Sequence, residues 1–210
     1  MNELTLYAYT FRSRAERIIW TLNEFEFPYT LIRLDPFKGE TASKNFLKLN
    51  PAKKVPVLVH GTEIFTESLA IMEYLNDIST HIKLTPTEPL ARYHYNRAIS
   101  YCATEIEPYL WLADQNSRLQ AYYQWPDGTA ATSIQRVRSA IPLVFKWLME
   151  QPYIAGDQFT LADIYYYQCL TWANNWAIDL PTHVADYLQK LAKRPAFPND
   201  MLNPASGNIQ

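Results

Sequence analysis

Glycine is scarce in this chain of 210 residues. The five glycines stand far apart along the sequence, at Gly39, Gly61, Gly128, Gly156 and Gly207. The P-loop and the dinucleotide-binding fingerprint both need clustered glycines, because backbone N–H groups must approach a phosphate closely. The spacing of the glycines therefore excludes both devices, and we expect no nucleotide cofactor.

Cysteine and histidine are also few, which restricts metal and redox chemistry. The two cysteines, Cys102 and Cys169, lie in apolar stretches of helical character, and no C-x-x-C pair occurs. This excludes the usual dithiol redox chemistry. The four histidines are scattered and lack the i, i+4 pairing of a helical zinc site. We expect no metal.

The chain has no surplus of basic charge and no long apolar run. Nineteen Lys+Arg stand against twenty-one Asp+Glu, a net charge of −2, so the composition does not favour nucleic acid as a partner. No apolar stretch approaches the roughly 18 residues of a membrane helix. The first residues show no charged segment followed by an apolar run. We therefore expect no signal peptide, no membrane association and a cytoplasmic location.

Strands and helices alternate in the first part of the chain, residues 1–79. Period-2 patterns predict short strands, and apolar residues at helical spacing predict the helices between them. In chain order the patterns predict a strand at 4–9, a helix at 14–25, a strand at 29–34, a helix at 41–49, a hairpin at 55–65 and a helix at 67–76. The order βαβ-α-ββ-α predicts an α/β domain, a small sheet flanked by helices.

The second part of the chain, residues 87–210, shows no strand pattern, and we expect an all-helical domain. The spacing of apolar residues predicts helices at 90–116, at 132–150, from 160 onward and at 183–192. Pro108 should kink the first of these helices. Thr160 and Asp163 stand three residues apart at the start of the third, a spacing that predicts a capping box.

Several segments resemble blocks of one enzyme family. They are SRAERIIWTLNE at 13–24 with Phe-Pro-Tyr at 27–29, Asn-Pro at 50–51, KVPVL at 54–58, TESLAIMEYL at 66–75, YIAGD at 153–157 and FTLAD at 159–163. The blocks extend over nearly the whole chain, in the order and at the spacing of that family. On these residues the chain resembles the cytosolic glutathione S-transferases, in particular the serine-type classes of a bacterial or fungal-like subgroup.

The resemblance implies a thioredoxin-like N-terminal domain that binds glutathione and an all-α C-terminal domain that supplies the electrophile pocket. It implies an enzyme whose glutathione thiolate attacks an apolar electrophile or reduces a peroxide, and a homodimer. Two alternatives stay open. One is a glutathione-binding or protein-interaction member with little catalysis, and the other is a glutathione-dependent isomerase or dehalogenase.

Ser13 is the residue that the resemblance places beside the glutathione sulfur. In the serine-type classes a hydroxyl here donates a hydrogen bond to that sulfur, and the alternative is an ordinary N-cap serine. Thr10 is the first rival, and Tyr7 and Tyr9 are the second, since other classes use a tyrosine of the first strand. However, alignment on the arginine after Ser13 places Ala8 at that tyrosine position, and Tyr7 and Tyr9 point to the opposite face.

Arg14 and the Val55-Pro56 dipeptide extend the implied site. Arg14 matches a position where some relatives carry an arginine near the sulfur, and its alternative is a solvated arginine of the first helical turn. The resemblance implies that the Val55–Pro56 bond is cis and that the Val55 backbone pairs with the cysteinyl unit of glutathione, like an added strand. The alternative is a trans proline on an edge strand, since few X–Pro bonds are cis.

The two ends of glutathione have candidate partners as well. Ser68 would hold the γ-glutamyl carboxylate at a helix N-terminus, and Glu67 would reach its amine, although capping alone also explains the pair. Lys54 would reach the glycyl carboxylate or the backbone beside it, or is an ordinary surface lysine. Lys38 and Thr41 lie in a loop that often adds a further glycyl contact.

Five residues of the first long helix form a face distinct from its apolar stripe. The resemblance implies that this face lines the electrophile pocket, and packing between helices is the alternative. The residues are Arg97, Tyr101, Thr104, Pro108 and Trp111. Asp163 resembles a buried aspartate of the family whose role, with Thr160, is structural.

Overall fold

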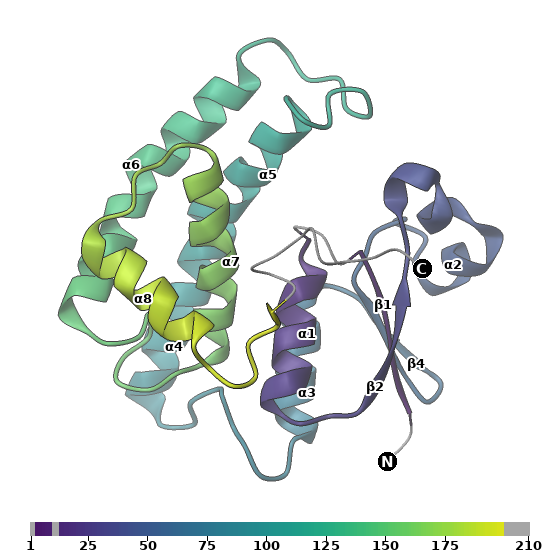
Figure 1. Ribbon diagram of the computed structural model, residues 1–210, viewed down its shortest axis with the longest axis horizontal. Helices are drawn as coiled ribbons and strands as arrows, with labels where there is room; N and C mark the ends of the chain where they lie inside the picture. Colours follow the sequence, from purple (N-terminus) through teal and green to yellow (C-terminus); the bar gives the residue numbers. More distant parts are fainter. Residues whose placement is uncertain (1–2, 10–12, 200–210) are drawn as a thin grey trace. The chain divides into compact units, whose positions relative to one another are not determined.

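The computed structural model describes residues 3–9 and 13–199 of the chain (Figure 1). These residues form two compact units. Residues 3–83 together with 194–199 make the first unit, and Leu84–Lys193 make the second. We expected the helical domain to extend over residues 87–210, whereas the residues that directly follow Lys193 belong to the first unit.

The first unit is built on a four-stranded sheet. Its strands are β1 (Leu4–Ala8), β2 (Tyr29–Arg33), β3 (Val57–His60) and β4 (Glu63–Phe65). The strand order is β2-β1-β3-β4. Strands β1 and β2 are parallel, and β3 is antiparallel to both β1 and β4. The parallel pair needs a crossover, which a helix supplies, whereas β3 and β4 are joined by a tight turn. The predicted βαβ-α-ββ-α order is confirmed.

Helices cover both sides of this sheet. Helices α1 (Ala15–Glu24) and α3 (Ser68–Ile78) pack together on one side, and α2 (Lys44–Leu49) lies on the other (Figure 1). Alternate residues of β1 are buried, namely Leu4, Leu6 and Ala8, while the residues between them are half-exposed. The ring of Tyr7 lies on the α2 side, 6.1 Å from that of Phe46. Tyr7 and Ala8 therefore face opposite ways, as the period of a strand requires.

Helix α2 begins three residues later than the spacing of apolar residues predicted. Two short 3₁₀ turns, Pro36–Lys38 and Glu40–Ala42, occupy the preceding segment. The helix starts after Ser43, whose hydroxyl accepts a hydrogen bond from the Phe46 N–H at 3.3 Å. A serine N-cap that satisfies a free N–H is a common helix start, and it fixes this boundary.

Residues 194–199 pack onto the end of α1. Arg194 binds the buried Glu24 carboxylate through two hydrogen bonds, from Nε to Oε1 at 2.6 Å and from Nη2 to Oε2 at 2.7 Å. The Trp20 indole donates to the same Oε1 at 2.9 Å, and its ring meets the Phe197 ring edge-on at 4.8 Å. A bidentate guanidinium–carboxylate pair is geometrically specific, so it holds the segment after α8 on the last turn of α1.

The second unit is helical. Its helices are α4 (Pro89–Tyr101), α5 (Glu107–Gln115), α6 (Thr129–Glu150), α7 (Leu161–Asn175) and α8 (Thr182–Ala192). Helix α7 is buried on all its faces over most of its length, which marks it as the central helix of this unit. None of the helices in the described part of the chain has the length and apolar character needed to cross a membrane.

The single helix predicted at 90–116 is interrupted. A π-helical segment, η3 (Cys102–Ile106), separates α4 from α5, and Pro108 lies in the first turn of α5. Proline is tolerated in a first turn, because its missing N–H would have no intrahelical partner there. A π-turn holds one more residue than an α-turn, so the residues after it are rotated by about 100° relative to a continuous α-helix.

Candidate functional site

The loop that precedes β3 carries the first part of the candidate site. The Val55–Pro56 peptide bond is cis, which confirms the prediction. The pairing of β3 with β1 begins at Val57, so Val55 lies beyond the end of that ladder. Asn50, which is buried, shapes this loop: its Nδ2 donates to the Lys54 carbonyl at 2.8 Å and its Oδ1 accepts from the Ala52 N–H at 3.0 Å.

Asn50 was part of a recognised sequence block but was not among the predicted site residues. Both of its bonds join it to backbone within four residues. Asparagine before proline is a common turn signal, and its side chain bonds nearby backbone in such turns. This local signal, an asparagine before a proline, would have been sufficient to predict that Asn50 stabilises the loop.

The N-terminus of α3 is the second part of the site. Glu67, directly before the helix, is exposed and has φ 67° and ψ 109°, a conformation that residues with a side chain rarely adopt. Ser68 is the first residue of α3 and is buried. Among the described residues, no side chain caps this helix, and its first turn holds no acidic residue. The free N–H groups and the positive end of the helix dipole therefore suit a bound carboxylate.

Arg17 lies behind this N-terminus. It belongs to α1 and is only 1% exposed, and its Nη1 donates to the Ser68 Oγ at 3.3 Å. Arg17 was not among the site residues predicted from the sequence. One signal was available, because Arg17 and the buried Thr21 and Glu24 fall at helical spacing on a face that also carries Trp20. Polar residues on a buried face need partners, and one of Arg17's partners is Ser68.

Ser13 lies just before α1, and its hydroxyl is engaged locally. The Ser13 Oγ donates to the Tyr9 carbonyl and accepts from the Ala15 N–H at 3.2 Å. The helix N-cap is Arg14, one residue later. A donation to sulfur therefore requires the Ser13 hydroxyl to turn away from the Tyr9 carbonyl. Its rival Thr10 lies outside the described residues.

The two tyrosine rivals lie on the face of β1 that carries the α2 segment. Tyr9 meets the ring of Phe37 edge-on at 5.8 Å, and Tyr7 lies near Phe46. Burial raises the pKa of the Tyr9 phenol, and the negative charge of Asp35 raises it further. A phenol with a raised pKa is a weaker acid, which disfavours Tyr9 as the group that stabilises a thiolate.

The candidate contacts to the glycyl end differ in exposure. Lys54 is exposed, and Lys38, whose side chain is 62% exposed, lies 3.9 Å from the Asp35 carboxylate. Thr41 is buried in its 3₁₀ turn, so it has less access to a ligand than the two lysines have. Arg14, at the start of α1, is half-exposed. These four assignments stay predictions.

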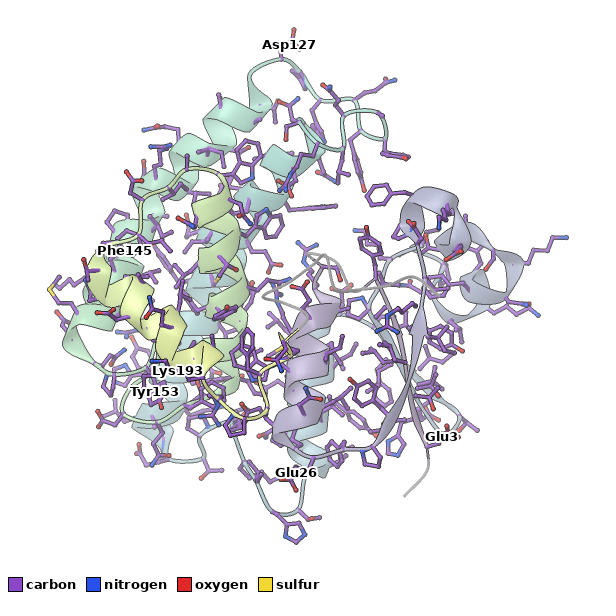
Figure 2. All side chains as sticks on the ribbon, viewed as in Figure 1. Glu3, Glu26, Asp127, Phe145, Tyr153 and Lys193 are labelled. Carbon is purple, nitrogen blue, oxygen red and sulfur yellow. The ribbon has the colours of Figure 1, made fainter. Side chains whose placement is uncertain are left out.

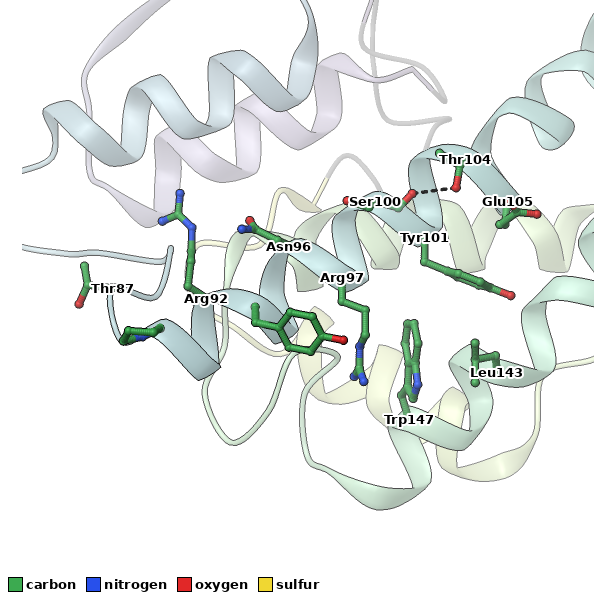
Figure 3. Close-up of a pocket in the computed structure, with 12 residues that line it drawn as sticks. Thr87, Arg92, Asn96, Arg97, Ser100, Tyr101, Thr104, Glu105, Leu143 and Trp147 are labelled. Carbon is green, nitrogen blue, oxygen red and sulfur yellow. Dashed lines mark hydrogen bonds between the residues drawn. The ribbon is translucent and has the colours of Figure 1, made fainter.

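In the second unit, part of the predicted electrophile face lines a groove between α4, η3 and α6 (Figure 3). The groove has a volume of about 970 Å³, and Arg97, Tyr101 and Thr104 are among its lining residues. Trp147 of α6 also lines the groove: the Arg97 guanidinium lies 4.3 Å from the centre of the Trp147 ring, and the Tyr101 ring lies 5.4 Å from it. Burial, and then the charge of Glu105, raise the pKa of Tyr101.

Pro108 and Trp111, the other two predicted pocket residues, do not line this groove. The rotation introduced by η3 explains the separation, because the prediction assumed continuous α-helical spacing. The Trp111 ring instead lies 6.0 Å from that of Tyr123 and 6.5 Å from that of Trp172 on α7. Tyr123 belongs to the loop between α5 and α6, whose tip carries Asp127 (Figure 2). The predicted face therefore belongs to two different surfaces of this unit.

A carboxylate orients the aromatic residues around Trp111. Asp114 accepts hydrogen bonds from the indole N–H groups of Trp172, at 3.1 Å, and Trp176, at 2.9 Å. Arg118 pairs with the same carboxylate, and its guanidinium lies 6.0 Å from the centre of the Trp176 ring. Because both oxygens have fixed donors, the two indoles are held in one orientation.

Asp163 is fully buried, and its hydrogen-bond partners among the described residues all belong to its own unit. The predicted capping box with Thr160 is present at the start of α7. The Asp163 carboxylate accepts from the Thr160 N–H and hydroxyl at 2.7 and 2.9 Å, from the Ile154 N–H at 2.9 Å and from the Tyr187 hydroxyl at 2.8 Å. Burial raises the pKa of this carboxyl, although the four donors act in the opposite direction. These contacts support a structural role.

The described residues contain no group of three or more His, Cys, Asp or Glu that could hold a metal ion. Cys102 and Cys169 are buried, and neither is in a disulfide.

Comparison with known proteins identifies the family. Residues 2–77 match the model of the glutathione S-transferase N-terminal domain, and residues 124–195 match that of the C-terminal domain. A glutathione S-transferase of Dianthus caryophyllus is 32% identical over 172 residues, which cover 78% of this chain and 74% of the relative. A probable maleylacetoacetate isomerase of Vibrio cholerae is 29% identical over 210 residues, 94% of each chain. The structure of a Sulfitobacter glutathione transferase homologue with bound glutathione has a TM-score of 0.80 at 24% identity, covering 94% of this chain and 96% of that one. The chain belongs to the glutathione S-transferase family.

Proposed function

We propose that this protein is a glutathione transferase that binds glutathione along the start of β3 and the N-terminus of α3. The observation that carries the proposal is that Val55, beyond the end of the β3 ladder, lies in the same unit as the N-terminus of α3, which no described side chain caps. The first can pair with an extended peptide backbone, and the second attracts a carboxylate. Glutathione carries both groups.

The tripeptide has one partner for each of its parts. Its γ-glutamyl carboxylate lies at the α3 N-terminus on Ser68, and its amine is within reach of Glu67. The cysteinyl unit pairs with the Val55 backbone. The glycyl carboxylate lies nearest to Lys54, with Lys38 as a further cation. Since Ser68 is buried and Glu67 exposed, the serine supplies the fixed contact and the glutamate the adjustable one.

The chemistry requires the glutathione thiol to ionise at neutral pH. A free thiol has a pKa of about 8.5, and lowering it by two units requires about 2.7 kcal/mol of preferential stabilisation of the thiolate. The Ser13 hydroxyl and the positive end of α1 can supply this amount, because a hydrogen bond to a charged group contributes about 1.5–3 kcal/mol and a helix dipole about 0.3–1 kcal/mol. Arg14 adds a positive charge beside the same helix start.

The thiolate then attacks an apolar electrophile or a peroxide, and the second unit supplies the contacts to that substrate. One relative carries the name of a probable maleylacetoacetate isomerase, so isomerisation with the same bound glutathione is the second candidate. We further propose a cytoplasmic homodimer. Exposed apolar side chains on α4 and α6, among them Leu90, Tyr93 and Leu143, support self-association. Light scattering at micromolar concentration tests it, and a monomer would refute it.

A combined binding and turnover assay tests the proposed function. Wild type, Ser13→Ala and Ser68→Ala are compared for retention on immobilised glutathione and for conjugation of an aryl halide. Ser139→Ala, an exposed serine of α6, is the matched control. We expect Ser13→Ala to retain binding while turnover falls by roughly one to three orders of magnitude. Ser68→Ala should weaken retention. Retention without turnover of any electrophile would instead favour a binding protein.

A further inference from the structure

The buried contact between α1 and α3 sets which way the Ser68 hydroxyl can act. Arg17 and Ser68 are 51 residues apart in sequence, and both are more than nine-tenths buried. Their hydrogen bond has one possible direction, because a guanidinium carries five donors and no acceptor. Ser68 Oγ is therefore the acceptor, and its own proton remains to be donated.

That proton has no acceptor within the described part of the chain. The contact with Arg17 is the one hydrogen bond that the Ser68 side chain makes with the described residues. A buried donor without a partner costs stability, so the arrangement is favourable when a ligand supplies the acceptor. The proton belongs to the first residue of α3, where backbone N–H groups are also free.

We propose that Arg17 is a positioning residue for glutathione. It fixes Ser68 as a hydrogen-bond donor to the γ-glutamyl α-carboxylate and adds positive potential behind the helix N-terminus. This inference rests on the proposed function, and it concerns one group of the ligand. Arg17 itself does not touch the tripeptide. Its effect therefore depends on the carboxylate and vanishes for a ligand that lacks it.

Two analogues of glutathione isolate the carboxylate. 4-Aminobutyryl-cysteinyl-glycine retains the amine but lacks the α-carboxylate, and glutaryl-cysteinyl-glycine retains the carboxylate but lacks the amine. Calorimetry gives the Kd of each ligand for wild type, Arg17→Met and Arg17→Lys. Arg33→Met, an exposed arginine of β2, controls for the loss of one positive charge from the same unit.

We expect Arg17→Met to weaken binding of glutathione and of the glutaryl analogue by about tenfold or more, since a hydrogen bond to a charged group is worth about 1.5–3 kcal/mol. Binding of the aminobutyryl analogue should change by less than about twofold. Arg17→Lys retains a donor-only cation and should restore most of the selectivity. Arg33→Met should leave it unchanged.

A purely structural role for Arg17 predicts a different result, in which all three ligands weaken equally in Arg17→Met. That result would overturn the proposal. If Arg17→Met does not fold, Arg17→Gln replaces it, because its neutral side chain also removes the cation and equal weakening of the three ligands there has the same meaning. The double variant with Ser68→Ala gives a further check, since Arg17→Met should then have a smaller effect on carboxylate selectivity than it has when Ser68 is present. Failure of wild type to bind any of the three ligands would instead refute the proposed function, and this inference with it.

Discussion

Replacement of Asp163 by asparagine tests whether one buried carboxylate organises the start of α7. Each carboxylate oxygen accepts two hydrogen bonds, and one bond of each pair comes from a backbone N–H, that of Ile154 or that of Thr160. Asparagine has one oxygen and one NH₂ group. In either orientation the NH₂ faces a backbone N–H, which cannot turn away as a hydroxyl can.

The expected loss of unfolding free energy follows from the number of hydrogen bonds that asparagine can still accept. One buried N–H left without an acceptor costs about 1–3 kcal/mol, and the bonds that remain are no longer charge-assisted. We therefore expect Asp163→Asn to lose about 2–4 kcal/mol of unfolding free energy. For a chain of this length that lowers the Tm by roughly 4–16 °C. Thermal unfolding by circular dichroism measures the change, with Asp157→Asn, an exposed aspartate of the preceding loop, as the control. Equal Tm values for the two variants would refute the role assigned to Asp163.

Wild type and Asp163→Asn together also test the direction of the pKa shift of Asp163. Burial raises the pKa of Asp163 above its ordinary value of 3.8, so the folded state holds this proton more tightly than the unfolded state does. Its contribution to stability is therefore fully present below the ordinary pKa and is lost as the pH rises through the raised one. Asparagine does not titrate. The stability difference between wild type and Asp163→Asn should thus increase as the pH is lowered from neutral, and a difference that shrinks would contradict the direction of the shift.

Three further substitutions test other contacts. Arg194→Ala leaves the buried Glu24 carboxylate without its bidentate partner and should lower the unfolding free energy by about 3–5 kcal/mol, whereas Lys193→Ala, which is exposed, should have little effect in the same denaturant titration. Asp114→Asn can accept from only one of the two indoles, so we expect a red shift of tryptophan emission, and an unchanged spectrum would contradict the orientation described. Gly128→Ala meets open space but keeps φ near 83°, so the strained backbone alone should cost about 1–2 kcal/mol, measurable as a lower Tm.

The features that sequence predicted well are those set by neighbouring residues. The alternation of strands and helices and the capping box at Thr160 and Asp163 each depend on a few adjacent positions. The cis bond before Pro56 was instead implied by the family resemblance. The α2 boundary was wrong by three residues because Ser43, rather than the apolar spacing, starts that helix. Local capping chemistry decided the boundary there.

The features that sequence did not predict depend on residues far apart in the chain. Arg17 meets Ser68 across 51 positions, and Arg194 meets Glu24 across 170. No periodicity connects such pairs, since each is brought together by the packing of whole elements. The division of the electrophile face had a different cause. Helical spacing was extended through Cys102–Ile106, where the backbone takes one additional residue per turn.

The additional residue in η3 sets the rotation of α5 relative to α4 about their common helical path. Helix α4 lies before it and helix α5 after it, so deleting a single residue there would turn every α5 side chain by about 100° about the axis while leaving α4 in place. The Trp111 side chain would then contact residues on a different side of α5, although residue 111 itself is unchanged. The surroundings of every α5 side chain can therefore be altered by the length of a five-residue segment as well as by the identity of the residues that follow it.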